Sequence, residues 1–184
     1  MSLGMVAVGC GADDTGPVPG LAEADEVPLV DTTADPNPAF VWSGAYKAGD
    51  LPPLEVGRPS AQFMEDAHRD PAEADELVCF GASGGYGCEP ALDARDGQPL
   101  VSGANFGGPN VLAWVWLDVP EETAAVQLTD QSGATVWQRP IDRVVILPAN
   151  VAPDGECACR LDALDRDGET IASVDLLTGS HTKN

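Results

Sequence analysis

The sequence predicts a mainly β protein, a small antiparallel β-sandwich or barrel with one or two short helical turns. Short apolar runs rich in β-branched and aromatic residues recur between residues 77 and 174, and clusters of turn residues separate them. The chain also has 20 glycines and 16 prolines among its 184 residues, which favours many turns. Short strands with turn residues at this spacing are typical of small all-β domains.

The first ten residues predict a secretion signal. Apolar or small residues from Leu3 to Gly9 lead directly to Cys10. The stretch Ala7–Cys10 resembles the lipobox of bacterial lipoproteins, whose cysteine is diacylated and becomes the new N-terminus. We therefore expect residues 1–10 to be a signal-peptide remnant and Cys10 to be a lipid anchor. The alternative is a short buried strand that carries a free cysteine.

Residues 11–38 predict a flexible acidic linker. This segment holds seven acidic residues, five prolines and no base. Such a composition buries too little apolar surface to offset the entropy lost on ordering. The alternative is an extended segment that packs along the domain, for which Val27–Val30 is the best candidate. A single β-rich domain over residues 39–178 and a polar tail over residues 179–184 complete the expected organisation.

Order is expected to begin near Phe40, followed by a loop rich in proline and glycine at residues 49–53. Ser60 is a good N-cap for a short helix over Ala61–His68. Asp70 followed by Pro71 predicts the start of a second helical turn, since proline suits the first helical position.

The expected strands are apolar runs bounded by turn signals. They are Leu77–Phe80, Val111–Val119, Ala124–Thr129, Ala134–Gln138, Val144–Leu147, Arg160–Leu164 and Thr170–Val174. The turn sequences Asp130-Gln-Ser-Gly133 and Asp165-Arg-Asp-Gly168 each lie between two of these runs and predict hairpins.

The stretch from Val115 to Val174 includes DVPEETAAVQLTDQSGATVWQRPIDRVVILP and RLDALDRDGETIASV. It resembles the C-terminal β-rich module of uncharacterised exported, lipoprotein-like proteins of high-GC Gram-positive bacteria. In those proteins a glycine-rich Cys-loop-Cys hairpin often precedes the module, as Cys79 to Cys88 does here. The resemblance implies a β fold and an exported location, and it implies no activity. The sequence Cys157-Ala-Cys159 has no counterpart in that pattern.

The chain has five cysteines, so four remain if Cys10 is the lipid anchor. Cys79 and Cys88 flank a glycine-rich loop, and we expect them to form a disulfide worth about 2–3 kcal/mol. On a regular strand Cys157 and Cys159 would share a face about 7 Å apart, at the limit for a bridge. Crossed pairing of Cys79 and Cys88 with Cys157 and Cys159 stays open.

The charge of the chain excludes several classes of partner. Thirty acidic and nine basic residues give a formal net charge of −21. Nucleic acids and anionic membrane surfaces attract Lys and Arg, so neither is an expected partner. The sequence has no apolar run of roughly eighteen residues, the length of a membrane span. Contact with a membrane is therefore expected only through the lipid anchor.

The sequence predicts no catalytic residue, no cofactor and no strong metal site. Gly81-Ala-Ser-Gly-Gly85 matches the nucleophile elbow of hydrolases, but the helix that must follow the serine is not predicted. Asp165, Asp167 and Glu169 are a weak cation candidate, because their spacing differs from that of an EF-hand loop. The Cys157-x-Cys159 spacing is too short for a typical zinc pair.

Trp114 and Trp116 alternate along one strand and should share one face of a sheet. That face is either a ligand platform or part of the core, where large aromatic residues usually lie. The sequence therefore predicts an exported, lipid-anchored, non-enzymatic binding or interaction module at the cell surface, for an unknown extracellular protein or ligand. The alternatives are a small secreted hydrolase that uses a carboxylate pair and a cation-dependent adhesion module.

Overall fold

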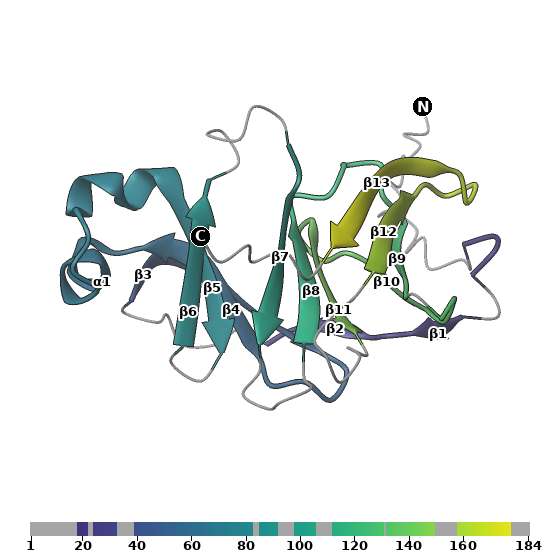
Figure 1. Ribbon diagram of the computed structural model, residues 1–184, viewed down its shortest axis with the longest axis horizontal. Coiled ribbons are helices and arrows are strands. Elements are labelled where there is room, and N and C mark those ends of the chain that lie inside the picture. The colour runs from purple at the N-terminus through teal and green to yellow at the C-terminus, as the bar shows by residue number, and fades with distance from the viewer. Residues whose placement is uncertain are drawn as a thin grey trace, which may run out of the picture.

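The computed structural model describes residues 18–21, 24–32, 39–82, 85–91, 98–105, 112–130, 132–149 and 158–177. The protein is mainly β, as predicted, and its strands form three sheets (Figure 1). Within the described residues the sheets stack on one another and none closes into a barrel, so the sandwich form of the prediction is confirmed.

The N-terminal sheet has the strand order β2-β3-β4-β5-β6. These strands are Leu29–Asp31, Phe40–Ala48, Leu54–Pro59, Leu77–Ala82 and Gly85–Pro90. The central sheet has the order β11-β8-β7, with strands Val144–Ala149, Leu112–Leu117 and Leu100–Asn105. The C-terminal sheet has the order β1-β10-β9-β12-β13. Its strands are Asp25–Glu26, Thr135–Gln138, Ala125–Thr129, Ala158–Leu164 and Thr170–Leu177.

Two short helices follow β4, as their capping signals predict. The Ser60 hydroxyl accepts a hydrogen bond from the Phe63 amide at 3.1 Å at the start of α1, Ala61–Asp66. Asp70 accepts from the amide of Ala72 at 2.9 Å at the start of η1, the 3₁₀ helix Pro71–Glu76. Both caps satisfy amides that have no partner within the helix.

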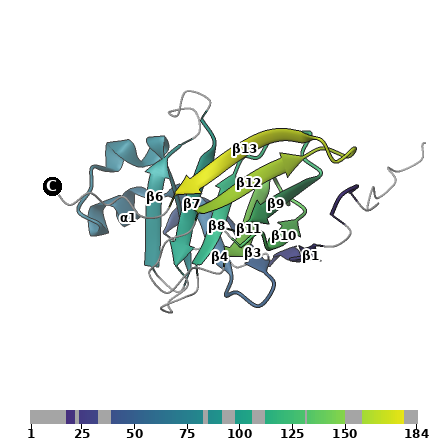
Figure 2. The same ribbon diagram turned by 45° about the vertical axis from the view of Figure 1, so that its right-hand side comes forward.

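The central sheet is buried on both faces, as Figure 2 shows by its place between the other two sheets. Alternate residues of β8 and β11 enter two different cores. Trp114, Trp116, Val145 and Leu147 pack against the C-terminal sheet. Val115, Leu117, Val144 and Ile146 pack against the N-terminal sheet. This double burial explains why both strands are continuously apolar in the sequence.

Both predicted hairpin turns are confirmed and share one construction. In the β9–β10 turn the carboxylate of Asp130 accepts from the amides of Ser132 and Ala134 at 2.8 and 3.0 Å. In the β12–β13 turn the carboxylate of Asp165 accepts from the amides of Asp167 and Glu169, both at 2.9 Å. Gly133 and Gly168 follow, each with φ of +81°, a conformation that favours glycine. These are three-residue loops that end on a left-handed residue.

The prediction of a flexible linker is wrong for the described part of residues 11–38. Val18 and Leu21 are buried in a small core with Trp137, and β1 pairs in parallel with β10. Three residues later β2 pairs antiparallel with β3. The segment also passes so close to the β12–β13 turn that a Cβ on Gly168 would meet the Pro19 carbonyl oxygen at 2.6 Å. Few but well-spaced apolar residues and backbone pairing suffice to order it.

This N-terminal segment leads from the C-terminal sheet to the N-terminal sheet and passes the edge of β11. At this edge the side chain of Gln138, from β10, is fully buried. The Gln138 carbonyl oxygen accepts from the Ile146 amide at 2.6 Å. Its amide group donates to the Ile146 carbonyl at 2.9 Å and to the Val27 carbonyl at 3.2 Å. One side chain therefore pairs the open edge of the central sheet and binds the crossing segment.

Replacing this amide should be costly, since Gln138→Ala leaves two backbone groups of Ile146 and the Val27 carbonyl without their side-chain partner. We expect the free energy of unfolding, measured by urea titration, to fall by about 2–4 kcal/mol. Gln127→Ala on the neighbouring β9 is the matched control, because the Gln127 side chain makes no hydrogen bond to a described residue and the expected loss is below about 1 kcal/mol. Equal losses in the two variants would contradict the role assigned to Gln138.

Candidate ligand-binding site

A pocket of about 360 Å³ lies between the N-terminal and central sheets, at the end where β5, β7 and β11 begin. One wall comes from the N-terminal sheet and its flanks, with Val56, Leu77, Val78 and Ala91. The other wall comes from the central sheet, with Leu100, Leu117 and Val144. The volume falls within the range of roughly 300–1,000 Å³ that is usual for small-molecule sites.

Four charged side chains complete the lining of this pocket: Arg58, Asp75, Asp118 and Asp142. Arg58 pairs with Asp75 at 3.0 Å. Asp118 pairs at 2.7 Å with Arg143, which lies behind the pocket wall. The pocket therefore combines apolar walls with a few convergent polar groups, the usual character of a binding site.

The corner beside the pocket is held in an unfavourable backbone conformation. Asp118, Asp142 and Arg143 have φ of +58°, +49° and +64°, in the left-handed region that residues other than glycine seldom adopt. Two hydrogen bonds with Val119 hold the corner. The Arg143 side chain donates to the Val119 carbonyl at 2.8 Å, and the Val119 amide donates to the Arg143 carbonyl at 3.0 Å. Left-handed residues cost about 1–3 kcal/mol each and often occur at binding sites.

Asp142 is exposed at the pocket and also lies near the buried hydroxyl of Tyr46. Burial raises the pKa of Tyr46 above its ordinary value of 10.0, and the charges of Asp142 and Asp31 and a hydrogen bond with Asp142 raise it further. The folded protein therefore holds the phenol proton more tightly than the unfolded chain. The associated stability is present below pH 10 and is lost as the pH rises through the raised pKa.

A second pocket of about 490 Å³ lies on the other side of Asp118, against β13. Asp118 and Arg143 in its lining pair with each other, and the hydroxyl of Ser173 is bound to Asp162 and Arg160. The charged side chains of this second pocket pair with each other, whereas the first pocket also contains Asp142, which makes no ion pair with a described residue, so the first pocket is the better candidate site.

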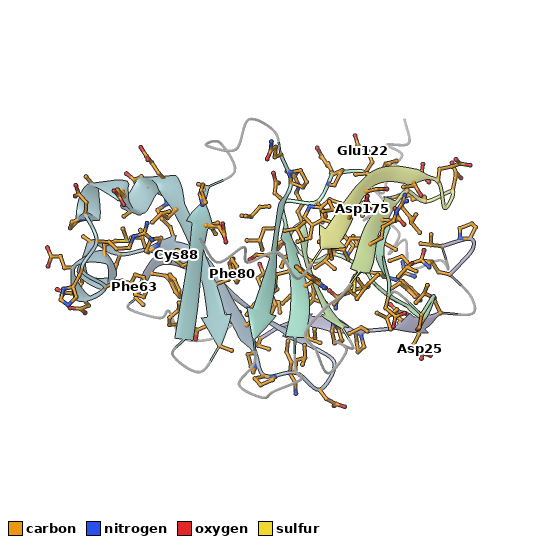
Figure 3. The ribbon with its side chains drawn as sticks, viewed as in Figure 1. Asp25, Phe63, Phe80, Cys88, Glu122 and Asp175 are labelled. Atoms are coloured by element: carbon orange, nitrogen blue, oxygen red, sulfur yellow. A yellow bond between two sulfur atoms is a disulfide. The ribbon has the colours of Figure 1, made fainter. Side chains whose placement is uncertain are left out.

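The predicted disulfide is present. Cys79 and Cys88 lie directly opposite each other on β5 and β6, with their Cα atoms 4.0 Å apart. Crossed pairing of these two cysteines with Cys157 and Cys159 is therefore wrong. Cys159 is also disulfide-bonded, and its partner lies outside the described residues. Figure 3 shows Cys88 on the N-terminal sheet, in the same half of the molecule as the buried Phe80.

Trp114 and Trp116 share one face of β8, as predicted, but they form no open ligand platform. Their exposed fractions are only 8% and 2%, because the C-terminal sheet covers that face. Neither indole nitrogen has a hydrogen-bond partner among the residues that the structure describes. The core alternative is therefore correct for both residues.

The acidic cluster Asp165, Asp167 and Glu169 is a hairpin turn. One carboxylate oxygen of Asp165 accepts from two backbone amides, which it would have to give up to bind a cation fully. In the described part of the chain, no group of three or more His, Cys, Asp or Glu residues could hold a metal ion.

Several predicted features lie outside the described residues: Cys10, Cys157, Ser83 of the elbow-like motif, and residues 179–184. The pocket residues Arg58, Asp75, Asp118 and Asp142 were not predicted, because they come from four separate segments. Asp118 alone carried a usable signal, as a carboxylate directly after a buried strand.

Comparison of the chain with protein-family models, with curated proteins and with solved structures found no match.

The contact between Tyr46 and Asp142 can be tested by titrating the phenol. Tyr86→Phe leaves Tyr46 as the single tyrosine of a chain that has two. We expect its pKa, followed by ultraviolet absorbance, to lie above 10.0 and to fall when Asp142→Asn is added, since that change removes the negative charge of Asp142 and weakens its hydrogen bond with the phenol. Asp167→Asn on the distant β12–β13 turn is the control and should leave the pKa unchanged. An Asp142→Asn variant with an unaltered phenol pKa would place Asp142 away from Tyr46.

Proposed function

We propose that this protein is an exported, lipid-anchored, non-enzymatic binding module that holds a small, mainly apolar ligand between its N-terminal and central sheets. The observation that carries this proposal is the apolar pocket of about 360 Å³ with a charged rim. Seven of its lining side chains are apolar, so burial of ligand carbons would supply most of the affinity.

Binding is favoured over hydrolysis by the state of the pocket carboxylates. A glycosidase-like mechanism needs two carboxylates free to donate a proton and to attack or activate water. Asp75 and Asp118 are each held by an arginine, at 3.0 and 2.7 Å. Only Asp142 among the pocket acids makes no ion pair with a described residue.

One finding is consistent with a location outside the cytoplasm. The Cys79–Cys88 disulfide is of a kind that persists in oxidising compartments. Among the helices described, none is long and apolar enough to cross a membrane.

Hexanol is a suitable first probe of the pocket. Burial of about five of its carbons at about 0.8 kcal/mol each would give about 4 kcal/mol and a Kd on the order of 1 mM. We expect saturable shifts of the methyl signals of Val56, Leu117 and Val144 in an NMR titration. Ala91→Phe, which fills the mouth, should weaken binding at least about tenfold.

The matched control is Ala134→Phe, the same substitution at an exposed position of the β9–β10 turn, on a different sheet. It should bind hexanol like the wild type. Absence of saturable binding, or equal affinity in the Ala91→Phe variant, would refute the pocket as the binding site.

The lipid anchor is tested separately by metabolic labelling with palmitate in cells that express the native gene. We expect the wild type to be labelled and to fractionate with membranes, and Cys10→Ala to lose both properties. Ser83→Ala serves as a control that should keep the label. A Cys10→Ala protein that is still labelled would exclude Cys10 as the acylated residue.

A further inference from the structure

The charges that line the pocket are unequally compensated. Arg58 and Asp75 neutralise each other at 3.0 Å, and Arg143 neutralises Asp118 at 2.7 Å. Asp142 makes no ion pair with any described residue, and the group that faces it from β3 is the Tyr46 hydroxyl, which is uncharged at neutral pH. Among the described residues, the pocket therefore presents one negative charge that has no ion-pair partner.

From this charge distribution and the apolar walls we propose that the ligand is an organic cation, with an ammonium group at Asp142 and an alkyl body between the two sheets. The proposal deepens the proposed function and rests on it. Three features fit such a ligand: apolar side chains from both sheets form the walls, the carboxylate of Asp142 has no ion-pair partner among the described residues, and the one arginine among the described lining residues is paired with Asp75.

A neutral or anionic ligand fits less well. An anion would have to share Arg58 with Asp75, whose charge already offsets that of the guanidinium, and it would also be repelled by Asp142. A neutral amphiphile would bury the same carbons but would gain nothing from the carboxylate. The side chain of Asp142 is exposed, so the gain from a cation is modest, about two- to fivefold in affinity.

Two kinds of ligand carry an ammonium group on an alkyl chain: a free amine and the lysine side chain of a protein. The experiment therefore compares hexanol, hexylammonium, hexanoate and Nα-acetyl-lysine methylamide by NMR titration of the full chain. We expect hexylammonium to bind about two- to fivefold more tightly than hexanol, and hexanoate to bind more weakly than hexanol. Saturable binding of the lysine derivative at the same methyl groups would identify a protein side chain as a source, and its absence would identify a free amine.

Asp142→Asn is the decisive variant, since asparagine tolerates the left-handed backbone of this position. The ratio of the hexanol Kd to the hexylammonium Kd should fall to about 1. Asp167→Asn changes the net charge of −21 by the same unit at an exposed turn and should keep the full preference. This control separates a local contact from general attraction of cations to an acidic protein.

The outcomes distinguish the two proposals. If none of the probes binds saturably, the proposed function fails and this inference fails with it. If hexanol binds but hexylammonium binds no more tightly, the pocket is retained as the binding site and the proposal of a cationic ligand is rejected. A preference that persists in Asp142→Asn, or that is lost equally in Asp167→Asn, also overturns the assignment to Asp142.

Discussion

One buried amide, that of Gln138 in the C-terminal sheet, binds both the edge of the central sheet and the segment that leads to the N-terminal sheet. β11 is an edge strand, so the amide and carbonyl of Ile146 that point away from β8 need partners in a place without water. Gln138 supplies an acceptor and a donor in the arrangement of a strand backbone. Its remaining N–H holds Val27, which lies between β1 and β2. An aliphatic side chain at this position could not form these hydrogen bonds. The free-energy cost of burying the Ile146 and Val27 backbone groups without partners would exceed the gain from packing the aliphatic side chain.

Pairing of that edge allows the central sheet to be covered on both faces. β8 and β11 send alternate side chains into two cores, so the three sheets behave as two sandwiches that share one layer. Where β8 ends at Leu117 the chain must leave this layer at once, and Asp118 takes a left-handed conformation to do so. The pocket lies at this end of the layer, with the last side chains of the strands as its walls. The site is thus a consequence of how the central sheet terminates.

Sequence patterns predicted best those elements whose cause is local. The Ser60 cap, the two aspartate turns and the Cys79–Cys88 bridge each depend on residues within ten positions of one another. β4 and β7 were missed, because Leu54–Pro59 and Leu100–Asn105 contain glycine, proline or asparagine and have weak strand propensity. Pairing with neighbouring strands makes them β all the same. The N-terminal segment was misjudged for a related reason, since its composition resembles a linker while its backbone finds partners on two sheets.

By itself the sequence determined the mainly β class, the turn positions, the helix caps and one disulfide, because turn geometry, capping and short loops follow from the residues present. Tertiary structure alone decided which faces are buried. Period-two alternation placed Trp114 and Trp116 on one face of β8, but whether water or another sheet lies over that face depends on how β9, β12 and β13 pair and pack against it. The tertiary structure also determined where the candidate site lies. Non-local strand pairing brings together the four segments that carry the charged lining residues Arg58, Asp75, Asp118 and Asp142.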